Sequence, residues 1–433
     1  MKGIRIMPSP LNGEVSIPPS KSISHRAIIC AGLAEGISNI GNIVFSDDIT
    51  ATLKGMEAFG IEIVNISEDY IHGNSKITIN GSEKLNIFSR TINCKESGST
   101  LRFLIPISGF SGKTVTFTGK GKLVERPLDA YYKIFDEQNI KYNNTNGKLP
   151  LTVEGLLKPD IFEVEGDISS QFITGLMFVL PLLNGDSRIV VTSELESKGY
   201  VDLTIDVLKK FSILIENNAY KDFYIKGNQK YKNIAYVVEG DFSQAAFWVV
   251  AGLLNGGIKC SNINIDSLQG DKAILDVAKA MGGKLKLYDD NIEISKSFTK
   301  GTTIDASQYP DLVPILAVLG SLSSGTTKIT NAKRLRIKES DRLNAITTEL
   351  NKLGADIMEL EDGLVITGKE QLSGGTVDSW NDHRIAMALA IASTRCTSPV
   401  YLTNYDSVKK SYPTFWDDFK MLGGKFDEWN LGE

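Results

Sequence analysis

Six short polar segments hold most of the residues that could do chemistry in this 433-residue chain. They read PPSKSISHRA (18–27), ESGSTLRF (96–103), GDISSQFI (166–173), EGDFSQAAF (239–247), SQYPDLVP (307–314) and NDHRIAM (381–387), and each precedes an apolar run. Serine, aspartate and asparagine are typical of a helix start, where their side chains satisfy the free N–H groups of the first turn. Capping alone does not require the basic and amide side chains that these segments also carry, namely Lys21, His25, Arg26, Arg102, Gln171, His383 and Arg384.

Exposed N–H groups, the positive end of the helix dipole and basic side chains together favour anions. If several of these helix starts face one another, they form a pocket for a strongly anionic small molecule. Further basic side chains lie on expected loops, at Arg126, Arg334, Arg336, Lys338, Arg342, Lys409 and Lys410. The segment 333–342 taken alone is equally compatible with a solvated charged helix, and its place in the repeat described below favours the site.

Other kinds of site find no support in the residue pattern. SGKT at 111–114 is no phosphate-binding P-loop, because Ile107 stands where its first glycine must be. The three histidines, His25, His72 and His383, have no spacing typical of a metal site, so we expect no metal and no cofactor. No G-x-S-x-G motif or cysteine beside a base indicates covalent acyl chemistry.

The composition is that of an ordinary globular protein, with 42% hydrophobic and 23% charged residues. Its 47 Lys and Arg against 52 Asp and Glu give a net charge of −5, which argues against a general nucleic-acid binder. Four dispersed cysteines without a CxxC pair favour a reducing compartment. Residues 1–10 lack the apolar stretch of a secretory signal, and the run 172–183 is too short to span a bilayer. We therefore expect a cytoplasmic protein with no membrane partner.

An internal repeat organises the chain. Six apolar runs each end in small residues and lead into a strand pattern, and their turns fall at Gly36, Gly112, Gly185, Gly256, Gly325 and Ser398, 69 to 76 residues apart. A second pattern, a helix end followed by a strand, keeps the same period, as in AFGIEIV and KLGADIME. Solenoid repeats are usually shorter, so each unit of about 72 residues is expected to be a βαβ-type fold. Six units could form one ring or two clusters of three, with the best break near Val237–Asp241.

Eight motifs resemble the 3-phosphoshikimate 1-carboxyvinyltransferases, or EPSP synthases, in the family's order along the chain. They are SKSISHR (20–26), ESGST (96–100) with Arg102, ERP (125–127), SSQF (169–172), ESKGY (196–200), YPD (309–311), KESDR (338–342) and NDHR (381–384). The resemblance implies an α/β fold of two domains, each of three similar units, with the active site in the cleft between them. The expected domains are residues 20–238, and residues 1–19 with 239–433.

The resemblance implies transfer of the enolpyruvyl group of phosphoenolpyruvate to the 5-hydroxyl of shikimate 3-phosphate. Inorganic phosphate leaves through a tetrahedral addition-elimination intermediate, on the way to chorismate and the aromatic amino acids. The expected partners are these two small anions alone, in a monomer that closes around them. The family is also the target of the inhibitor glyphosate.

The family's functional residues carry over onto matching positions of this chain. Shikimate 3-phosphate would be held by Lys21, Ser22, Arg26, Ser169, Ser170, Gln171, Ser197, Asp311 and Lys338. Phosphoenolpyruvate would be held by Lys21, Gly98, Arg126, Gln171, Arg342, Arg384 and Lys410. In catalysis, Asp311 would accept the hydroxyl proton and Glu339 would exchange a proton with the methylene carbon, beside Lys21. For Asp311 a capping role at a helix start is the alternative.

Three departures from the family pattern and two rival functions accompany the resemblance. Glu96 and Ser97 replace the Asn-Ala common in the family, and Phe103 replaces a proline, on the loop that lines the phosphoenolpyruvate and glyphosate pocket. Arg334 replaces the asparagine of some relatives. The related UDP-N-acetylglucosamine enolpyruvyl transferase has a cysteine on the loop that here reads GKGKLVERPLD. A catalytically silent anion-binding repeat protein is the other alternative.

Overall fold

The computed structural model describes residues 2–67 and 75–430, so His72 lies outside the described residues. The chain divides into two compact units, which are described separately. The continuous unit comprises Pro19–Glu239, and the split unit comprises Met1–Pro18 and Gly240–Glu433. Within the described ranges, the strands form six four-stranded sheets, three in each unit.

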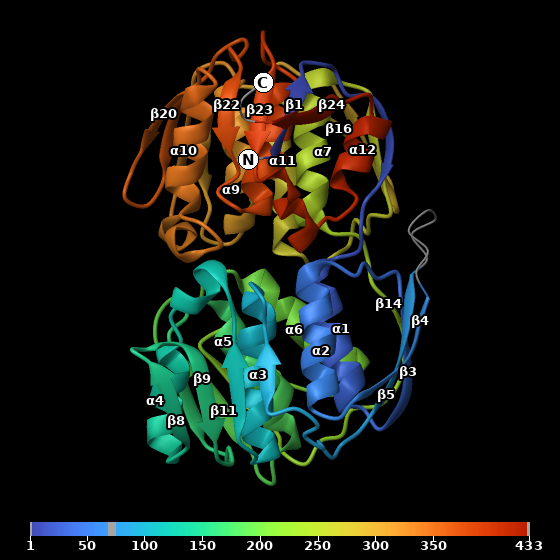
Figure 1. The fold of residues 1–433 in the computed structure, drawn as a ribbon, viewed down its shortest axis with the longest axis vertical. Helices are drawn as coiled ribbons and strands as arrows, with labels where there is room; N and C mark the ends of the chain where they lie inside the picture. Colours follow the sequence, from blue (N-terminus) through green and yellow to red (C-terminus); the bar gives the residue numbers. More distant parts are fainter. Residues whose placement is uncertain (1, 68–74, 431–433) are drawn as a thin grey trace. The chain divides into compact units, whose positions relative to one another are not determined.

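The continuous unit holds three of these sheets and six α-helices in the part that the structure describes (Figure 1). Its sheets, in strand order, are β14 (Ala235–Val237), β3 (Gly36–Gly41), β5 (Lys76–Gly81) and β4 (Glu62–Ser67); β6 (Thr91–Asn93), β7 (Val115–Thr118), β9 (Lys148–Glu154) and β8 (Lys141–Thr145); and β10 (Ile161–Val164), β11 (Ser187–Val191), β13 (Asp222–Ile225) and β12 (Glu216–Asn218). Its helices are α1 (Lys21–Leu33), α2 (Asp47–Ala58), α3 (Gly98–Ser111), α4 (Asp129–Gln138), α5 (Ser170–Val179) and α6 (Lys198–Lys210).

The split unit has the same make-up over its described residues. Its sheets are β2 (Gly13–Ser16), β15 (Ile258–Ser261), β17 (Asn291–Ser295) and β16 (Lys284–Leu287); β18 (Thr303–Asp305), β19 (Thr326–Thr330), β21 (Leu364–Thr367) and β20 (Asp356–Glu359); and β22 (Gly375–Asp378), β23 (Val400–Thr403), β1 (Lys2–Met7) and β24 (Lys425–Asn430). Its helices are α7 (Phe242–Asn255), α8 (Ile274–Ala280), α9 (Val313–Ser321), α10 (Arg342–Lys352), α11 (His383–Ser393) and α12 (Phe415–Met421).

All six sheets share one pairing scheme, which confirms the α/β repeat expected from the sequence. In each, the first two strands run parallel and the remaining pairs run antiparallel. The six apolar runs form α1, α3, α5, α7, α9 and α11, and each leads into the second strand of a sheet. Gly112 shows why glycine suits the turn, because it ends α3 with φ at 64°, a left-handed conformation that costs glycine little.

Two short strands belong to a different unit from the helix that follows each of them in the chain, which the periodicity did not indicate. Strand β2 comes just before α1 in the chain but pairs in parallel with β15 of the split unit. Strand β14 comes just before α7 but pairs in parallel with β3 of the continuous unit. In both cases the expected βαβ unit is completed by a distant piece of chain, so those two repeats are not contiguous in sequence.

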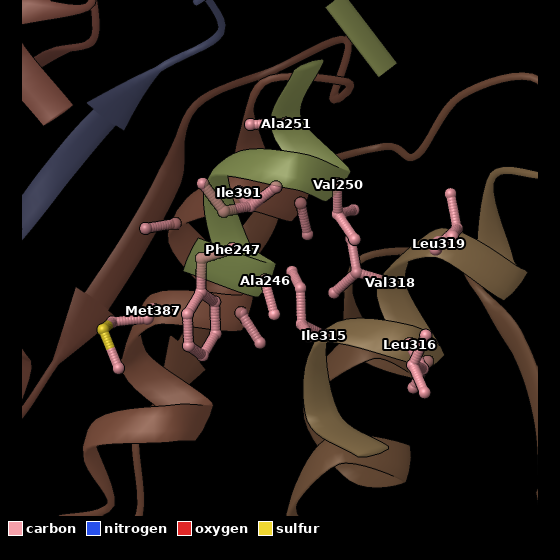
Figure 2. Packing of buried hydrophobic residues seen from close by; sticks show 14 of the residues in the cluster. Ala246, Phe247, Val250, Ala251, Ile315, Leu316, Val318, Leu319, Met387 and Ile391 are labelled. Atoms are coloured by element: carbon pink, nitrogen blue, oxygen red, sulfur yellow. The ribbon is translucent and has the colours of Figure 1, made fainter. Parts of the chain in front are cut away.

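The central helices are buried on every side, which concentrates the chemistry at their ends. In the split unit, α7 packs against α9 and α11 through Phe247, Val250, Ile315 and Met387 (Figure 2). In the continuous unit, α3 packs against α5 and α1 against α6. Because the central helices are apolar along most of their length, their charged residues lie in the first two turns, as Arg26 does in α1 and Arg102 in α3. Among the described residues, none of the helices is both long and apolar enough to cross a membrane.

Candidate active site

Side chains cap five of the six central helices, as the polar segments predicted. Ser20, Ser97, Ser169, Asp241 and Asp382 accept hydrogen bonds from first-turn N–H groups of α1, α3, α5, α7 and α11. The sixth, α9, follows a 3-10 turn at Pro310–Leu312 and has Leu312 at its N-cap position. Each first turn is therefore fixed, and the basic side chains beside it are presented from a rigid scaffold.

In the continuous unit, arginine and glutamine side chains gather around Gly98, the first residue of α3. A Cβ placed on Gly98 would lie 2.7 Å from Arg126 Nη1, 3.3 Å from Arg102 Nη1 and 3.5 Å from Gln171 Oε1. Arg102 Nη1 donates to Gln171 Oε1 at 2.9 Å, and Gln171 Nε2 donates to Ser99 Oγ at 3.0 Å. Both arginines are buried. The missing side chain at position 98 thus leaves space that two guanidinium groups border.

Arg26 lies at the contact of α1 and α6, with hydrogen bonds from all three of its nitrogens. Nε donates to Thr204 Oγ1 at 2.8 Å, Nη1 to the Ser22 carbonyl at 2.7 Å and Nη2 to the Tyr200 carbonyl at 3.0 Å. Its guanidinium lies 5.3 Å from the centre of the Phe103 ring. Burial lowers the pKa of Arg26 to about 10, so the group keeps its charge at neutral pH. Phe103, one of the departures from the family pattern, therefore supports a basic residue.

Lys21 begins α1 and forms an ion pair with Asp48 of α2, Nζ to Oδ2 at 2.9 Å. The carbonyl of Asp48 accepts from Thr100 of α3, whose hydroxyl also donates to Ser97 Oγ at 2.8 Å. Thr52 Oγ1 lies 2.7 Å from both Thr100 Oγ1 and His25 Nδ1. This chain of polar contacts ties the first turns of three helices together.

The serines predicted to bind substrate lie at two other helix starts. Ser169 caps α5, and Ser170 is buried in its first turn. Ser197 precedes α6 in a left-handed conformation with φ at 55°, and its side chain makes no cap hydrogen bond. Glu96, another of the departures, lies against Gly121, where a Cβ would meet its Oε2 at 2.9 Å.

The split unit contains a buried arginine that binds three carboxylates at once. Arg342 is the first residue of α10, and its side chain is 1% exposed. Nη1 donates to Asp311 Oδ1 at 2.9 Å, Nη2 to Glu339 Oε2 at 2.7 Å and Nε to Asp382 Oδ2 at 2.8 Å. Burial opposes the charge of Arg342, but the three carboxylates outweigh it and raise its pKa. The structure thus brings both predicted catalytic carboxylates onto one guanidinium.

Asp311 is surrounded by cations. Its Oδ2 accepts from Arg384 Nη2 at 2.8 Å, and Lys338 Nζ lies 3.8 Å from Oδ1. Burial alone would raise the pKa of Asp311, but Arg384, Lys338 and Arg342 hold it well below its usual range. Burial lowers the pKa of Lys338 to about 8, although Asp311 partly opposes this. The 3-10 turn that contains Asp311 and the helix α9 that follows it have no side-chain cap hydrogen bond, so Asp311 does not cap either. The Asp311 carboxylate faces these cations instead.

The remaining predicted cations of the split unit have separate partners. Lys410 Nζ donates to the Asn381 carbonyl at 2.5 Å, and Arg334 Nη2 donates to the Ser307 carbonyl at 2.7 Å. Residues 333–342 do not form one charged helix, because a 3-10 turn at Lys333–Ile337 precedes α10. Arg336 pairs with Glu359 at 2.7 Å, so it has a structural partner.

Three residues of these clusters were missed as site residues by the sequence analysis. Asp382 stands within the NDHR motif, and only its acceptance from Arg342 shows that its charge balances a buried guanidinium. Ser243, in the first turn of α7, accepts from Arg384 Nη2 at 3.0 Å. Nothing in the sequence marked Asp48, the partner of Lys21, as a site residue. An aspartate at a helix start is common, because its negative charge interacts favourably with the helix dipole.

The two clusters are suited to anions and to proton transfer. Buried or half-buried guanidinium and ammonium groups bind phosphate and carboxylate groups, and arginine does so with two parallel hydrogen bonds. Asp311 and Glu339 are carboxylates that can exchange protons. No group of three or more His, Cys, Asp or Glu within residues 2–67 and 75–430 could hold a metal ion.

Comparison with known proteins agrees with this chemistry. Residues 6–419 match the family model described as EPSP synthase (3-phosphoshikimate 1-carboxyvinyltransferase). Proteins named 3-phosphoshikimate 1-carboxyvinyltransferase from Clostridium novyi and Clostridium acetobutylicum are 62% and 58% identical, with full coverage of both chains. An EPSP synthase structure from Acinetobacter baumannii has a TM-score of 0.82 at 23% identity, covering 99% of this chain and 100% of that one, which shows the shared fold. The resemblance seen in the motifs is therefore confirmed, and the chain belongs to the EPSP synthase (3-phosphoshikimate 1-carboxyvinyltransferase) family.

Proposed function

We propose that this chain transfers the enolpyruvyl group of phosphoenolpyruvate to the 5-hydroxyl of shikimate 3-phosphate, releasing inorganic phosphate. The product, 5-enolpyruvylshikimate 3-phosphate, leads to chorismate and the aromatic amino acids. The family membership supports this reaction. The structural observation that carries it is Asp311, a carboxylate held between the buried guanidiniums of Arg342 and Arg384. Such a group can change its proton affinity when an anionic substrate competes for the arginines.

The cations of the two units divide between the two anionic substrates in this proposal. Shikimate 3-phosphate is assigned to Lys21, Ser22, Arg26, Ser169, Ser170, Gln171, Ser197, Asp311 and Lys338. Phosphoenolpyruvate is assigned to Lys21, Gly98, Arg126, Gln171, Arg342, Arg384 and Lys410. The proposal requires residues of both units to act on the same substrates, so we expect substrate binding to bring the units together. We expect the working protein to be a monomer in the cytoplasm.

The proton transfers follow from the charges around Asp311. Arg342 and Arg384 keep the pKa of Asp311 low, which makes Asp311 a weak base. When the carboxylate and phosphate of phosphoenolpyruvate bind these arginines, they compete for the same N–H groups, and the proton affinity of Asp311 rises. The same competition for Arg342 raises the proton affinity of Glu339, which enters this step protonated. Asp311 then takes the proton of the attacking 5-hydroxyl, while Glu339 delivers its proton to the methylene carbon. The roles reverse when phosphate leaves the tetrahedral intermediate.

The test is phosphate release from phosphoenolpyruvate with two acceptors supplied separately, shikimate 3-phosphate and UDP-N-acetylglucosamine. Release with shikimate 3-phosphate alone is the expected result, with mass spectrometry confirming the enol ether product. Release with the nucleotide sugar alone would assign the chain to the related transferase. Release with neither acceptor, from protein whose folding is verified by circular dichroism, would contradict the proposal and favour a silent anion-binding protein.

A further inference from the structure

The backbone just before α11 is strained at two consecutive residues. Trp380 and Asn381 both have positive φ, at 54° and 53°. Asparagine tolerates this left-handed region, but for a bulky side chain such as tryptophan it is an outlier that the surrounding structure must enforce. These residues link β22 to the capping residue Asp382, so their conformation sets where the first turn of α11 begins.

A buried carboxylate on the neighbouring helix α10 holds this conformation. Glu349 is 1% exposed. Its Oε1 accepts from the indole Nε1 of Trp380 at 2.8 Å, and its Oε2 accepts from the backbone N–H of Asp378 at 3.0 Å. Lys352 Nζ lies 2.9 Å from both oxygens and balances the charge. Glu349 thus accepts hydrogen bonds from residues on both sides of Ser379, one from a backbone N–H and one from a ring N–H. Residues 379–381 are called the strained link below.

The link in turn presents two groups to the predicted phosphoenolpyruvate cations. The Asn381 carbonyl accepts from Lys410 Nζ at 2.5 Å. The next residue, Asp382, accepts from Arg342 Nε at 2.8 Å and from the backbone N–H of Arg384 at 2.9 Å. The side chains of Lys410 and Arg342, and the first turn that carries Arg384, therefore depend on where Asn381 and Asp382 are held.

We propose that Glu349 is a positioning residue for phosphoenolpyruvate binding, acting through Trp380 and the strained link on Lys410, Arg342 and Arg384. This inference rests on the proposed function, because it assigns these cations to that substrate. Glu349 does not touch the substrate. Its effect is to keep the three positive charges in the geometry that the bound anion needs, which costs less reorganisation when the anion arrives.

The test compares Glu349→Gln and Trp380→Phe with the wild-type protein in the phosphate-release assay. Glutamine keeps the shape but turns one acceptor oxygen into a donor, so it cannot serve both Trp380 Nε1–H and the Asp378 N–H. Phenylalanine removes the indole N–H together with part of the ring, so Glu349→Gln is the variant that changes the hydrogen bonds alone. We expect each variant to raise KM for phosphoenolpyruvate about tenfold, with kcat and KM for shikimate 3-phosphate changed less than about twofold.

The matched control is Ile346→Val, which removes one buried methyl group from the same helix and leaves the hydrogen bonds of Glu349 in place. It is expected to lower Tm and leave both KM values unchanged. The proposal is overturned if both test variants keep the wild-type KM for phosphoenolpyruvate, or if the control raises that KM for an equal loss of Tm. An equal rise for both substrates would also overturn it, because that result indicates a general loss of structure. An inactive wild-type protein would instead contradict the proposed function itself.

Discussion

The guanidinium of Arg342 donates to the carboxylate of Asp311 at 2.9 Å, so a predicted substrate-binding cation is neutralised by a predicted catalytic base. The two groups come from η4 (Pro310–Leu312) and from the first residue of α10. This pairing keeps the buried charges balanced, and it also keeps Asp311 deprotonated. An anion that binds Arg342 therefore changes the proton affinity of Asp311, which couples substrate binding to acid-base chemistry.

The Asp311→Asn variant tests the role of that carboxylate in turnover. Asparagine keeps the size of the side chain but cannot accept the hydroxyl proton, so kcat should fall by roughly 10²-fold or more. KM for phosphoenolpyruvate should not rise, because Arg342 and Arg384 lose a competing carboxylate. The measurement is steady-state phosphate release. Asp406→Asn, at an exposed aspartate paired with Lys409, is the control and should leave kcat unchanged. Normal turnover in Asp311→Asn would remove Asp311 from the mechanism.

The Arg342→Met variant tests how much the pairing of one buried arginine with three carboxylates contributes to the stability of the fold. It leaves Asp311, Glu339 and the fully buried Asp382 without their shared partner, and breaking such a buried cluster costs about 3–5 kcal/mol. The free energy of unfolding, measured by urea denaturation, should fall by that amount. Lys333→Met, at an exposed pair with Glu361, should change it by less than about 1 kcal/mol.

The loss of stability in Arg342→Met should become smaller at acid pH. The folded-state pKa of Asp311 lies below its value of 3.8 in an unfolded chain, so its ion pairs stabilise the fold above about pH 4. That contribution disappears as the pH falls through the lower, folded-state pKa. The difference in unfolding free energy between wild type and Arg342→Met should therefore narrow below about pH 4. A difference that stays constant from pH 7 down to pH 3 would show that the carboxylates are not its cause.

The lowered pKa of Lys338 predicts that kcat/KM for shikimate 3-phosphate decreases at alkaline pH. Burial lowers its pKa to about 8, so it loses its positive charge as the pH rises through that value. If Lys338 binds the anion, kcat/KM for shikimate 3-phosphate should fall above pH 8, because this parameter reports the ionisation of the free enzyme. Lys338→Arg stays charged and should flatten the profile. Lys333→Arg, at an exposed lysine, should keep the wild-type profile.

Gly98→Ala tests the space between the two arginines of the continuous unit. The new methyl group would lie 2.7 Å from Arg126 Nη1, so that guanidinium must move. We expect a several-fold rise in KM for phosphoenolpyruvate with little change in Tm. The control on the same helix is Gly109→Ala, whose methyl group meets Leu157 Cβ at an ordinary 3.4 Å. It should leave KM unchanged and stabilise α3 by up to about 1 kcal/mol. An unchanged KM in Gly98→Ala would argue against substrate at this position.

The sequence by itself determined the repeated elements and the residues that begin them. Apolar runs of helical period, serine or aspartate caps such as Ser97, and glycine turns such as Gly112 are local signals, so they remain readable without any partner segment. The basic residues of the first turns were visible for the same reason. The family motifs then indicated which substrates these residues would bind.

Tertiary structure alone decided which distant residues share a contact. The place of β2 in the split unit and of β14 in the continuous unit depends on pairing over more than 190 residues, and no local pattern encodes it. Arg342, which pairs locally with Glu339, also gathers Asp311 and Asp382 from two distant segments. Two other contacts likewise each join two elements, namely the ion pair of Lys21 with Asp48 and the hydrogen bond from Trp380 to Glu349. Such contacts are selected by the packing of whole helices and sheets, because burial is what makes an unpaired charge costly and a paired one necessary.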